Sequence, residues 1–376
     1  MRFAIWSPTN PRAGVSHVEL FRQQIREVEI AEELGFQNVW FYEHHLSATA
    51  PVPSPNLMIA AAARSTSRIR LGAMVNILPY RNPLLVAEEA AMLDVLTDGR
   101  LDMGIGRGLR PVEFDAFCVP QADSREMFLE SMQIIRRVWT DENFKFSGKY
   151  YKINKNAPLS PSLVQRPHPP FLISAQSPES IRFAAENDMP FAQIDALIED
   201  CERDQRFYRN IQIASGHKPA SRLFITREIY VADTDARARQ EALPYLLQYW
   251  DLWGRYTQFV REGRMPDDYD VWSKRAPMLH AMEFDELIER GLVMIGSAAT
   301  VCRRIIEHID RLDLYALAGV FKFGGMPYDM VIRSMRAFSA RVMPEIRQAL
   351  AASGQHRESR APAVGRSLVM TREGDV

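Results

Sequence analysis

Short apolar segments alternate with amphipathic helical segments along most of this 376-residue chain, and this alternation limits the possible folds more than any other feature. Eight of the apolar segments have the length and composition of buried strands, and a helical pattern follows each of them. A strand–helix–strand unit pairs its strands in parallel, with a right-handed crossover, which predicts an α/β fold. The predicted strands comprise residues 2–7, 39–42, 69–75, 101–105, 171–174, 191–194, 222–231 and 316–321.

Eight parallel strands and their helices close into a (β/α)8 TIM barrel, and the alternative is an open doubly wound sheet. We favour the barrel because the repeats fill about 350 residues without a linker to a second domain. The first helix is predicted between Ser16, which forms a capping box with Glu19, and Gly35, a left-handed C-terminal cap. The later helices comprise residues 56–66, 83–96, 125–140, 177–187, 196–214, 234–250, 297–311 and 329–350, with a hairpin at 144–153.

Two segments interrupt the alternation. Residues 255–290 are charged and irregular, and we expect them to form an insertion between the seventh and eighth strands of a single domain, residues 1–350. Residues 351–376 turn polar and rich in arginine, with no apolar periodicity from Ser353 onward. We therefore expect a disordered C-terminal tail.

The charge balance excludes several classes of partner. The chain has 46 Lys and Arg against 47 Asp and Glu, a formal net charge of −1 that gives no field for nucleic acid or an anionic membrane. Its three cysteines are far apart, so we expect neither a disulfide framework nor a zinc site, and no metal. No apolar run is long enough for a signal peptide or a membrane span, and we expect a cytoplasmic protein with a small-molecule partner.

Polar clusters follow three of the predicted strands. The second strand is followed by Glu43-His44-His45, the fourth by Gly106-Arg107-Gly108, and the fifth by Gln176-Ser177, with Ser180 in the next helix. Catalytic groups of TIM barrels lie at the carboxyl ends of the strands. These clusters are therefore the candidate site.

The adjacent histidines do not form an obvious metal site, because successive side chains of an extended segment point to opposite faces. Glu43 and His45 would share one face and His44 the other. A single imidazole at a barrel mouth suits general acid–base chemistry near neutral pH. The alternative is that both histidines only form hydrogen bonds within the loop.

The glycine-rich segment around Arg107 lacks the GxGxxG spacing of a dinucleotide site, and Pro111 is expected to prevent an immediate helix. Its glycines would allow Arg107 to approach a flat or anionic ligand, although a turn with a solvated arginine is the alternative. Ser177 and Ser180 at a helix start offer hydroxyl and N–H groups to an anion, or simply an N-terminal cap. We predict a phosphate-bearing ligand near one histidine.

Beyond these patterns, the sequence resembles the bacterial luciferase-like, flavin-dependent monooxygenases from about residue 3 to residue 350, and within them the catalytic subunit of luciferase. The resemblance rests on several blocks in the same order. They are Phe36-x-x-Val39-Trp40-Phe41-x-Glu43-His44-His45, Arg68-Ile69-Arg70-Leu71-Gly72, Ala87-Glu88-Glu89-x-x-Met92-Leu93-Asp94, Gly99-Arg100-Leu101, Gly104-Ile105-Gly106-Arg107-Gly108, Glu113-Phe114 and Ser124-Arg125-Glu126.

The resemblance implies a TIM barrel that uses reduced FMN and O2 to form a flavin hydroperoxide, which oxygenates an organic substrate such as an aldehyde or ketone. A separate reductase would supply the reduced FMN. His44 matches the catalytic histidine and Glu113 an acidic position beside it. A non-prolyl cis peptide of the family would fall near Met74 and Val75, which we expect under the flavin. The positions that grip the flavin phosphate are matched by Arg107, Arg125, Ser177 and Ser180, and those close to the flavin by Gly106 and Gln176.

The chain also departs from the resemblance. Gly106 replaces a cysteine of luciferase and Gln176 an acidic residue, which weakens any expectation of light emission. Residues 255–290 match the family's mobile active-site loop, and residues 51–66 match a surface through which family members form homodimers or heterodimers. Two alternatives stay open. One is a dehydrogenase that uses the deazaflavin F420 for hydride transfer, and the other is a non-catalytic partner subunit, which would not need His44 and Arg107.

Overall fold

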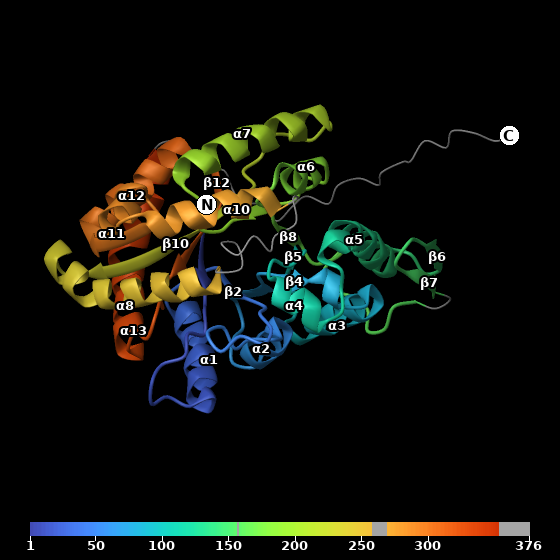
Figure 1. Ribbon diagram of the computed structural model, residues 1–376, viewed down its shortest axis with the longest axis horizontal. Coiled ribbons are helices and arrows are strands. Elements are labelled where there is room, and N and C mark those ends of the chain that lie inside the picture. The colour runs from blue at the N-terminus through green and yellow to red at the C-terminus, as the bar shows by residue number, and fades with distance from the viewer. Residues whose placement is uncertain (156–157, 258–268, 353–376) are drawn as a thin grey trace.

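The computed structural model describes residues 1–155, 158–257 and 269–352 of the chain. Eight parallel strands form a closed barrel, because the last of them pairs with the first. This confirms the predicted (β/α)8 fold (Figure 1). The barrel strands are, in order, β1 (Arg2–Trp6), β2 (Asn38–Phe41), β3 (Arg70–Ala73), β5 (Leu101–Gly106), β8 (Phe171–Ser174), β9 (Phe191–Gln193), β10 (Leu223–Ala232) and β12 (Leu314–Val320).

The helices surround the barrel, as the sequence pattern predicts. In α1, Ser16 accepts a hydrogen bond from the Glu19 N–H at 3.2 Å, and Gly35 follows the helix at a φ of +80°. Both predicted ends of this helix are thus confirmed. The helices at the predicted places are α1 (His17–Glu33), α2 (Pro55–Ala63), α3 (Pro83–Leu96), α5 (Ser124–Thr140), α6 (Pro178–Glu186), α7 (Ile198–Ala214), α8 (Asp235–Tyr256), α12 (Ala298–Arg311), α13 (Tyr328–Ala337) and α14 (Met343–Ala352).

The insertion between β10 and β12 is more regular than expected. Where the sequence predicts an irregular stretch, the structure has α10 (Asp270–Ala281) and α11 (Phe284–Glu289). A further strand, β11 (Val293–Ser297), pairs in parallel with the second half of β10, outside the barrel. Residues 258–268, which belong to the predicted active-site loop, lie outside the described residues.

Smaller differences have local causes. A short helix, α4 (Pro111–Ala116), begins where Pro111 was expected to prevent one, because proline is favoured in the first turn, where its missing N–H costs no hydrogen bond. A π-helical turn, Phe338–Val342, divides the predicted last helix into α13 and α14. That last helix extends to Ala352, and the rest of the predicted tail lies outside the described residues.

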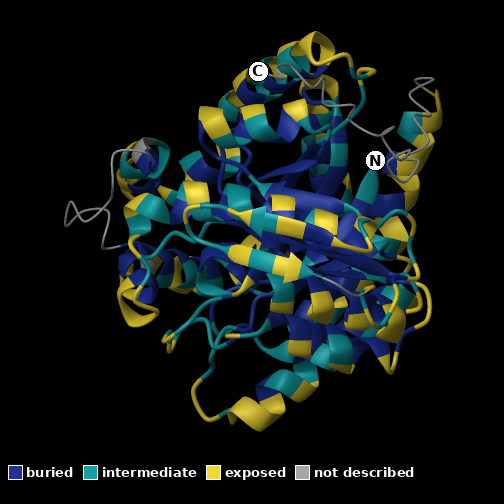
Figure 2. Cartoon of the chain, turned by 90° about the vertical axis from the view of Figure 1, so that its right-hand side faces the viewer, coloured by how far each residue is buried: buried dark blue, intermediate teal, exposed yellow. Residues whose placement is uncertain are grey.

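The remaining elements lie at the edges of the barrel. The predicted hairpin consists of β6 (Phe144–Ser147) and β7 (Lys152–Lys155), which pair antiparallel and carry many exposed residues (Figure 2). Strand β4 (Asn76–Ile77) continues beyond β3 and pairs with the end of β5. Two single 3-10 turns, Leu78–Tyr80 and Gln121–Asp123, precede α3 and α5.

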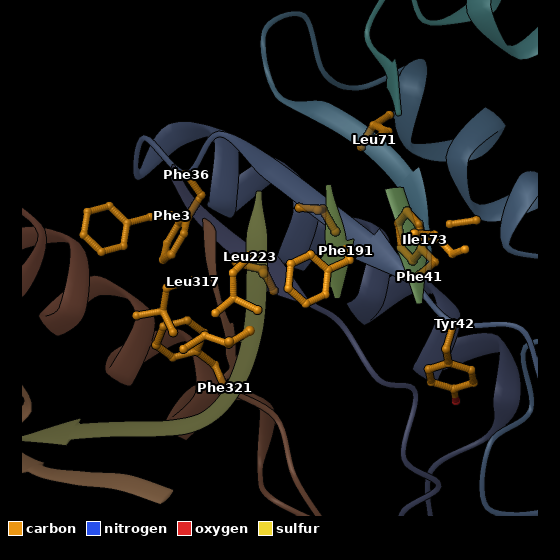
Figure 3. Close-up of a cluster of buried hydrophobic side chains, with 14 of the residues drawn as sticks. Phe3, Phe36, Phe41, Tyr42, Leu71, Ile173, Phe191, Leu223, Leu317 and Phe321 are labelled. Atoms are coloured by element: carbon orange, nitrogen blue, oxygen red, sulfur yellow. The ribbon is translucent and has the colours of Figure 1, made fainter. Parts of the chain in front are cut away.

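Two apolar layers hold the barrel together. The larger layer lies between the strands and the surrounding helices, and aromatic rings such as Phe36 and Phe321 meet in it at a centroid distance of 5.7 Å (Figure 3). A smaller inner layer includes Trp40, Met74 and Phe224. Each large side chain buried in this way contributes about 1.5–3 kcal/mol to folding. No helix in the described part of the chain is long and apolar enough to cross a membrane.

Candidate active site

A cavity opens at the carboxyl ends of the barrel strands, where the sequence predicts the site. Loops after β1, β2, β3, β5, β8 and β9 contribute to its wall, together with α8 and the start of α10 in the insertion. The structure brings nine of the ten predicted site residues to this wall, and the exception is Arg125. The nine are His44, Met74, Val75, Gly106, Arg107, Glu113, Gln176, Ser177 and Ser180.

His44 and Glu113 come from different loops and meet at the cavity. The Nδ1 atom of His44 lies 3.4 Å from Oε1 of Glu113, whose side chain is 1% exposed. The same oxygen accepts hydrogen bonds from the His45 N–H at 3.0 Å and from Arg110 at 3.2 Å. Burial raises the pKa of Glu113, but His44, the His45 N–H and Arg110 together outweigh burial and lower it. Glu113 is therefore ionised at neutral pH.

His45 has a different environment from its neighbour. Its Nε2 atom lies 3.0 Å from Oε1 of Glu43, and its ring packs edge-on against Phe117 at 4.7 Å. The other oxygen of Glu43 accepts the Ile77 N–H at 3.3 Å, while burial raises the pKa of this carboxyl. The two histidines thus face apart, as their extended backbone predicts. Glu43, which His45 contacts, links the loop after β2 to the segment after β3.

One wall of the cavity combines Met74, Val75 and Gly106. The Met74–Val75 peptide bond is cis, at the place that the family resemblance indicates. A Cβ atom on Gly106 would lie only 2.4 Å from Cγ2 of Val75. The glycine is therefore required by the close approach of β5 to Val75, and a cysteine at position 106 would need a different neighbour.

A candidate anion site lies where α6 begins. Ser177 is the N-terminal cap, since its Oγ accepts the Ser180 N–H at 3.3 Å, and it also bonds to the Ser180 hydroxyl at 3.2 Å. Arg107 lies across the cavity wall with its guanidinium 4.5 Å from the ring centre of Tyr269. N–H groups at a helix start, two hydroxyls and a guanidinium are the groups that bind a phosphate. Capping and anion binding are compatible here.

Arg125 stands apart from the other predicted phosphate ligands. Its guanidinium lies 3.5 Å from Glu179 in the first turn of α6, and it is not part of the cavity wall. Burial raises the pKa of Glu179, but the N–H of its own residue, Ser177, Arg125 and Arg107 lower it overall. Arg125 thus pairs with a carboxylate in the first turn of α6 and does not line the cavity.

The insertion is attached to the cavity by a buried arginine that sequence reasoning missed. Arg275 of α10 is 3% exposed, donates a hydrogen bond to the side-chain oxygen of Gln176, and lies 3.6 Å from Asp200 of α7. Gln176 in turn donates to the Ile194 carbonyl at 3.1 Å. An arginine in a charged, irregular segment carries no signal that it will be buried.

Two further wall residues were missed, and one of them could have been found. Asp195 follows β9, so the same rule that selected His44 and Arg107 applies to it. Trp253 of α8, to which the sequence pattern assigned no role, lines the cavity and donates a hydrogen bond to Asp195 at 2.9 Å. Within the described residues, no group of His, Cys, Asp or Glu side chains is placed to hold a metal ion.

These features define a TIM-barrel enzyme with an ionised carboxylate, an imidazole and a candidate anion site around one cavity. A family model described as luciferase-like monooxygenase matches residues 1–313. The chain therefore belongs to the luciferase-like monooxygenases, as the resemblance of its sequence blocks predicts.

Known proteins extend this comparison. The chain is 26% identical over 338 residues to the oxygenase component of a flavin-dependent trigonelline monooxygenase of Acinetobacter baylyi, which covers 87% of this chain and 90% of that protein. It is similar in structure to the oxygenating constituent of 3,6-diketocamphane monooxygenase of Pseudomonas putida, a type II Baeyer–Villiger monooxygenase solved with FMN. That match has a TM-score of 0.77 and 23% identity, and covers 92% of this chain and 98% of the other.

The same fold also occurs with a different cofactor. An F420-dependent secondary alcohol dehydrogenase, solved with an F420–acetone adduct, matches with a TM-score of 0.70 and 15% identity. The match covers 92% of this chain and 98% of the dehydrogenase. At this identity the likeness concerns the fold alone, and the residues of the cavity decide which cofactor fits.

Proposed function

We propose that this chain is the oxygenase component of a two-component flavin monooxygenase. It takes reduced FMN from a separate reductase and uses O2 to oxygenate a small aldehyde- or ketone-type substrate. The observation that carries the proposal is the single cavity shared by the anion site at Arg107 and the His44–Glu113 pair. In such a reaction one oxygen atom of O2 enters the substrate, the other leaves as water, and reduced FMN supplies the two electrons.

The residues present fit FMN. Arg107, Ser177, Ser180 and the start of α6 would hold the phosphate. Val75 packs directly against Gly106, so this part of the wall is apolar, as the face of a flavin ring system requires. When bound, reduced FMN supplies the reducing equivalents that activate O2.

The chain's own residues contribute proton handling and water exclusion. Glu113 holds the His44 ring through Nδ1, which directs Nε2 to accept and return protons. Tyr42 packs against His44 at a ring distance of 5.3 Å, and Trp253 and Trp272 add apolar surface to the wall. A wall of this kind limits the access of water to reactive groups.

The proposal is tested by isotope labelling with the purified chain. Chemically reduced FMN, ¹⁸O2 and a panel of aldehydes and cyclic ketones are mixed without a reductase, and products are analysed by mass spectrometry. We expect one ¹⁸O atom in the product. A parallel mixture in which reduced F420 replaces reduced FMN, and which yields an unlabelled alcohol without O2 uptake, would instead indicate an F420-type dehydrogenase. No turnover by the isolated chain, with turnover only after a second subunit is added, would indicate a partner subunit.

We further propose that two copies of the chain, or this chain and a related one, pair through α2 and α3. These helices expose large apolar side chains in the monomer. Exposed apolar side chains grouped on neighbouring helices are typical of protein interfaces. We place this dimer in the cytoplasm, with the three cysteines of this chain as free thiols. The exposed residues are Leu57, Leu85, Met92, Val95 and Leu96.

A further inference from the structure

Tyr269 lines the cavity, but the proposed function assigns it no role. It directly precedes α10 and is 5% exposed, although it belongs to the charged insertion. A buried tyrosine packs its ring and also needs a partner for its hydroxyl group. The contacts of this side chain therefore show which part of the cavity it supports.

The hydroxyl group of Tyr269 joins the insertion to two other segments of the chain. It donates a hydrogen bond to the carbonyl oxygen of Gly108, which follows β5, at 3.2 Å. It also lies 3.1 Å from the hydroxyl oxygen of Ser124, the fully buried first residue of α5. A phenol hydroxyl can donate one hydrogen bond and accept another. The ring is therefore held in one position by protein groups alone.

The face of this ring lies against Arg107. The guanidinium carbon of Arg107 is 4.5 Å from the ring centre, within the range of about 6 Å over which a cation is attracted to an aromatic face. A guanidinium is planar, and its N–H groups point outward from its edge. Stacking on a ring does not cover this edge, which is the part that binds phosphate oxygens. The contact thus orients Arg107 without blocking its N–H groups.

The position of Arg107 is important because the cavity has few charges of its sign. Among the described wall residues, Arg107 is the only arginine or lysine, and Ser177 and Ser180 beside it in the candidate anion site are neutral. A long side chain loses rotamer freedom when it binds a ligand, and it loses less if it is already held in place. A fixed ring against Arg107 therefore strengthens phosphate binding through the arginine.

We propose that Tyr269 is a positioning residue that holds the Arg107 guanidinium in place to bind the phosphate group of the cofactor. This inference rests on the proposed function, since it concerns how the cavity recognises FMN. It makes the preference for a phosphate-bearing flavin depend on the insertion. Tyr269 contributes to this preference only through Arg107, which separates its role from general support of the fold.

The first test compares reduced FMN with reduced riboflavin, which lacks the phosphate. Both are titrated anaerobically into the full chain, as the wild type, Tyr269→Leu and Tyr269→Phe. We expect Tyr269→Leu to weaken FMN binding about fivefold or more, and riboflavin binding less than about twofold. Tyr269→Phe keeps the ring, so it should bind FMN within about threefold of the wild type. Equal weakening of FMN and riboflavin binding in Tyr269→Leu would refute the inference.

The second test shows whether Tyr269 acts through Arg107. In the Arg107→Ala background, Tyr269→Leu should change FMN binding less than about twofold, because no guanidinium is left to position. The same loss of FMN affinity in both backgrounds would contradict the inference. The matched control is Trp272→Leu, since Trp272 of α10 also lines the cavity. It should change FMN and riboflavin binding by the same factor, and a selective loss of FMN binding as large as in Tyr269→Leu would count against a special role of Tyr269.

Inorganic phosphate alone separates this inference from the proposed function. Phosphate should raise the Tm of the wild type, because a ligand of the folded state stabilises it. We expect a clearly smaller rise in Tyr269→Leu and in Arg107→Ala. A wild type that shows this pattern but does not bind reduced FMN would refute the proposed function and leave the inference standing. An equal rise in the wild type and Tyr269→Leu, with FMN bound by the wild type, would overturn the inference and leave the proposed function standing.

Discussion

The Nδ1 atom of His44 and the Oε1 atom of Glu113 lie 3.4 Å apart, although the two residues are 69 positions apart in the sequence (113 − 44). The same Oε1 atom also accepts hydrogen bonds from the His45 N–H and from Arg110. One buried oxygen therefore holds the loop after β2 against the start of α4. This arrangement orients an imidazole at the cavity without exposing the carboxylate to solvent. The first two predictions concern this pair.

Replacing His44 by alanine removes the proton carrier but none of the groups of the anion site. We expect His44→Ala to lower the rate of substrate oxygenation by about 10²–10⁴-fold, with more reduced FMN lost as free hydrogen peroxide. Affinity for reduced FMN stays within about twofold of the wild type. Single-turnover product analysis beside a peroxide assay measures both. A tenfold or greater loss of FMN affinity would show that His44 acts mainly in binding.

Glu113→Gln tests the charge of the buried carboxylate through stability. Because the pKa of Glu113 is lowered in the folded protein, its charge stabilises the fold at pH values above its pKa in the unfolded chain. This contribution is lost as the pH falls through the lower pKa of the folded state. We expect the variant to lose about 1–3 kcal/mol at pH 7.

The difference in the free energy of unfolding between wild type and Glu113→Gln should therefore narrow as the pH falls. Urea unfolding at several values across pH 3–7 measures this difference. The exposed Glu88 supplies a control, since Glu88→Gln should change stability little at any pH. A difference in unfolding free energy between wild type and Glu113→Gln that widens as the pH falls would contradict an ionised Glu113.

Gly106→Ala introduces a methyl group into the contact with Val75. The added Cβ would lie 2.4 Å from Cγ2 of Val75, so either residue 106 or the Val75 side chain must move. We expect a loss of about 1–3 kcal/mol in stability and weaker flavin binding. The double variant with Val75→Ala should recover much of both, because it removes the methyl group in question. Equal effects of Gly106→Ala in the two backgrounds would exclude this contact as the cause.

Arg275 and Arg203 allow a matched test of how the insertion is held, since both pair with Asp200. The Arg275 side chain is 3% exposed and that of Arg203 is 60% exposed. We expect Arg275→Leu to speed hydrogen exchange of the α10 amides by at least tenfold, because a buried polar network loses its central donor. Arg203→Leu should leave exchange nearly unchanged. Similar exchange in both variants would mean that Arg275 does not anchor α10.

The fold could be predicted because buried parallel strands have short, continuous apolar sequences. Each of these is followed by a helical pattern, and the first helix has clear ends at Ser16 and Gly35. Strand β11 was missed because it lies outside the barrel and follows a charged segment. Helix α4 was missed because Pro111 was taken as a helix breaker, although proline favours a first turn.

The site was predicted in part by one rule, that polar residues after barrel strands face the same cavity. This rule led to His44 and Arg107, and it applies equally to Asp195, which was not considered. The assignments of Glu113 and Met74 depended on the family resemblance. The roles of Arg275 and Trp253 depend on how the insertion packs, and no local pattern in the sequence encodes that packing.

The most direct test of the account is an anaerobic titration of the chain with reduced FMN, reduced riboflavin and reduced F420, followed by the change in flavin absorbance. We predict one saturable site for reduced FMN. Binding should weaken about tenfold or more for riboflavin and in Arg107→Ala, and much less in Arg125→Ala, which lies behind Glu179. No saturable binding of reduced FMN, tighter binding of F420, or equal binding of FMN and riboflavin would contradict a flavin held by its phosphate at Arg107.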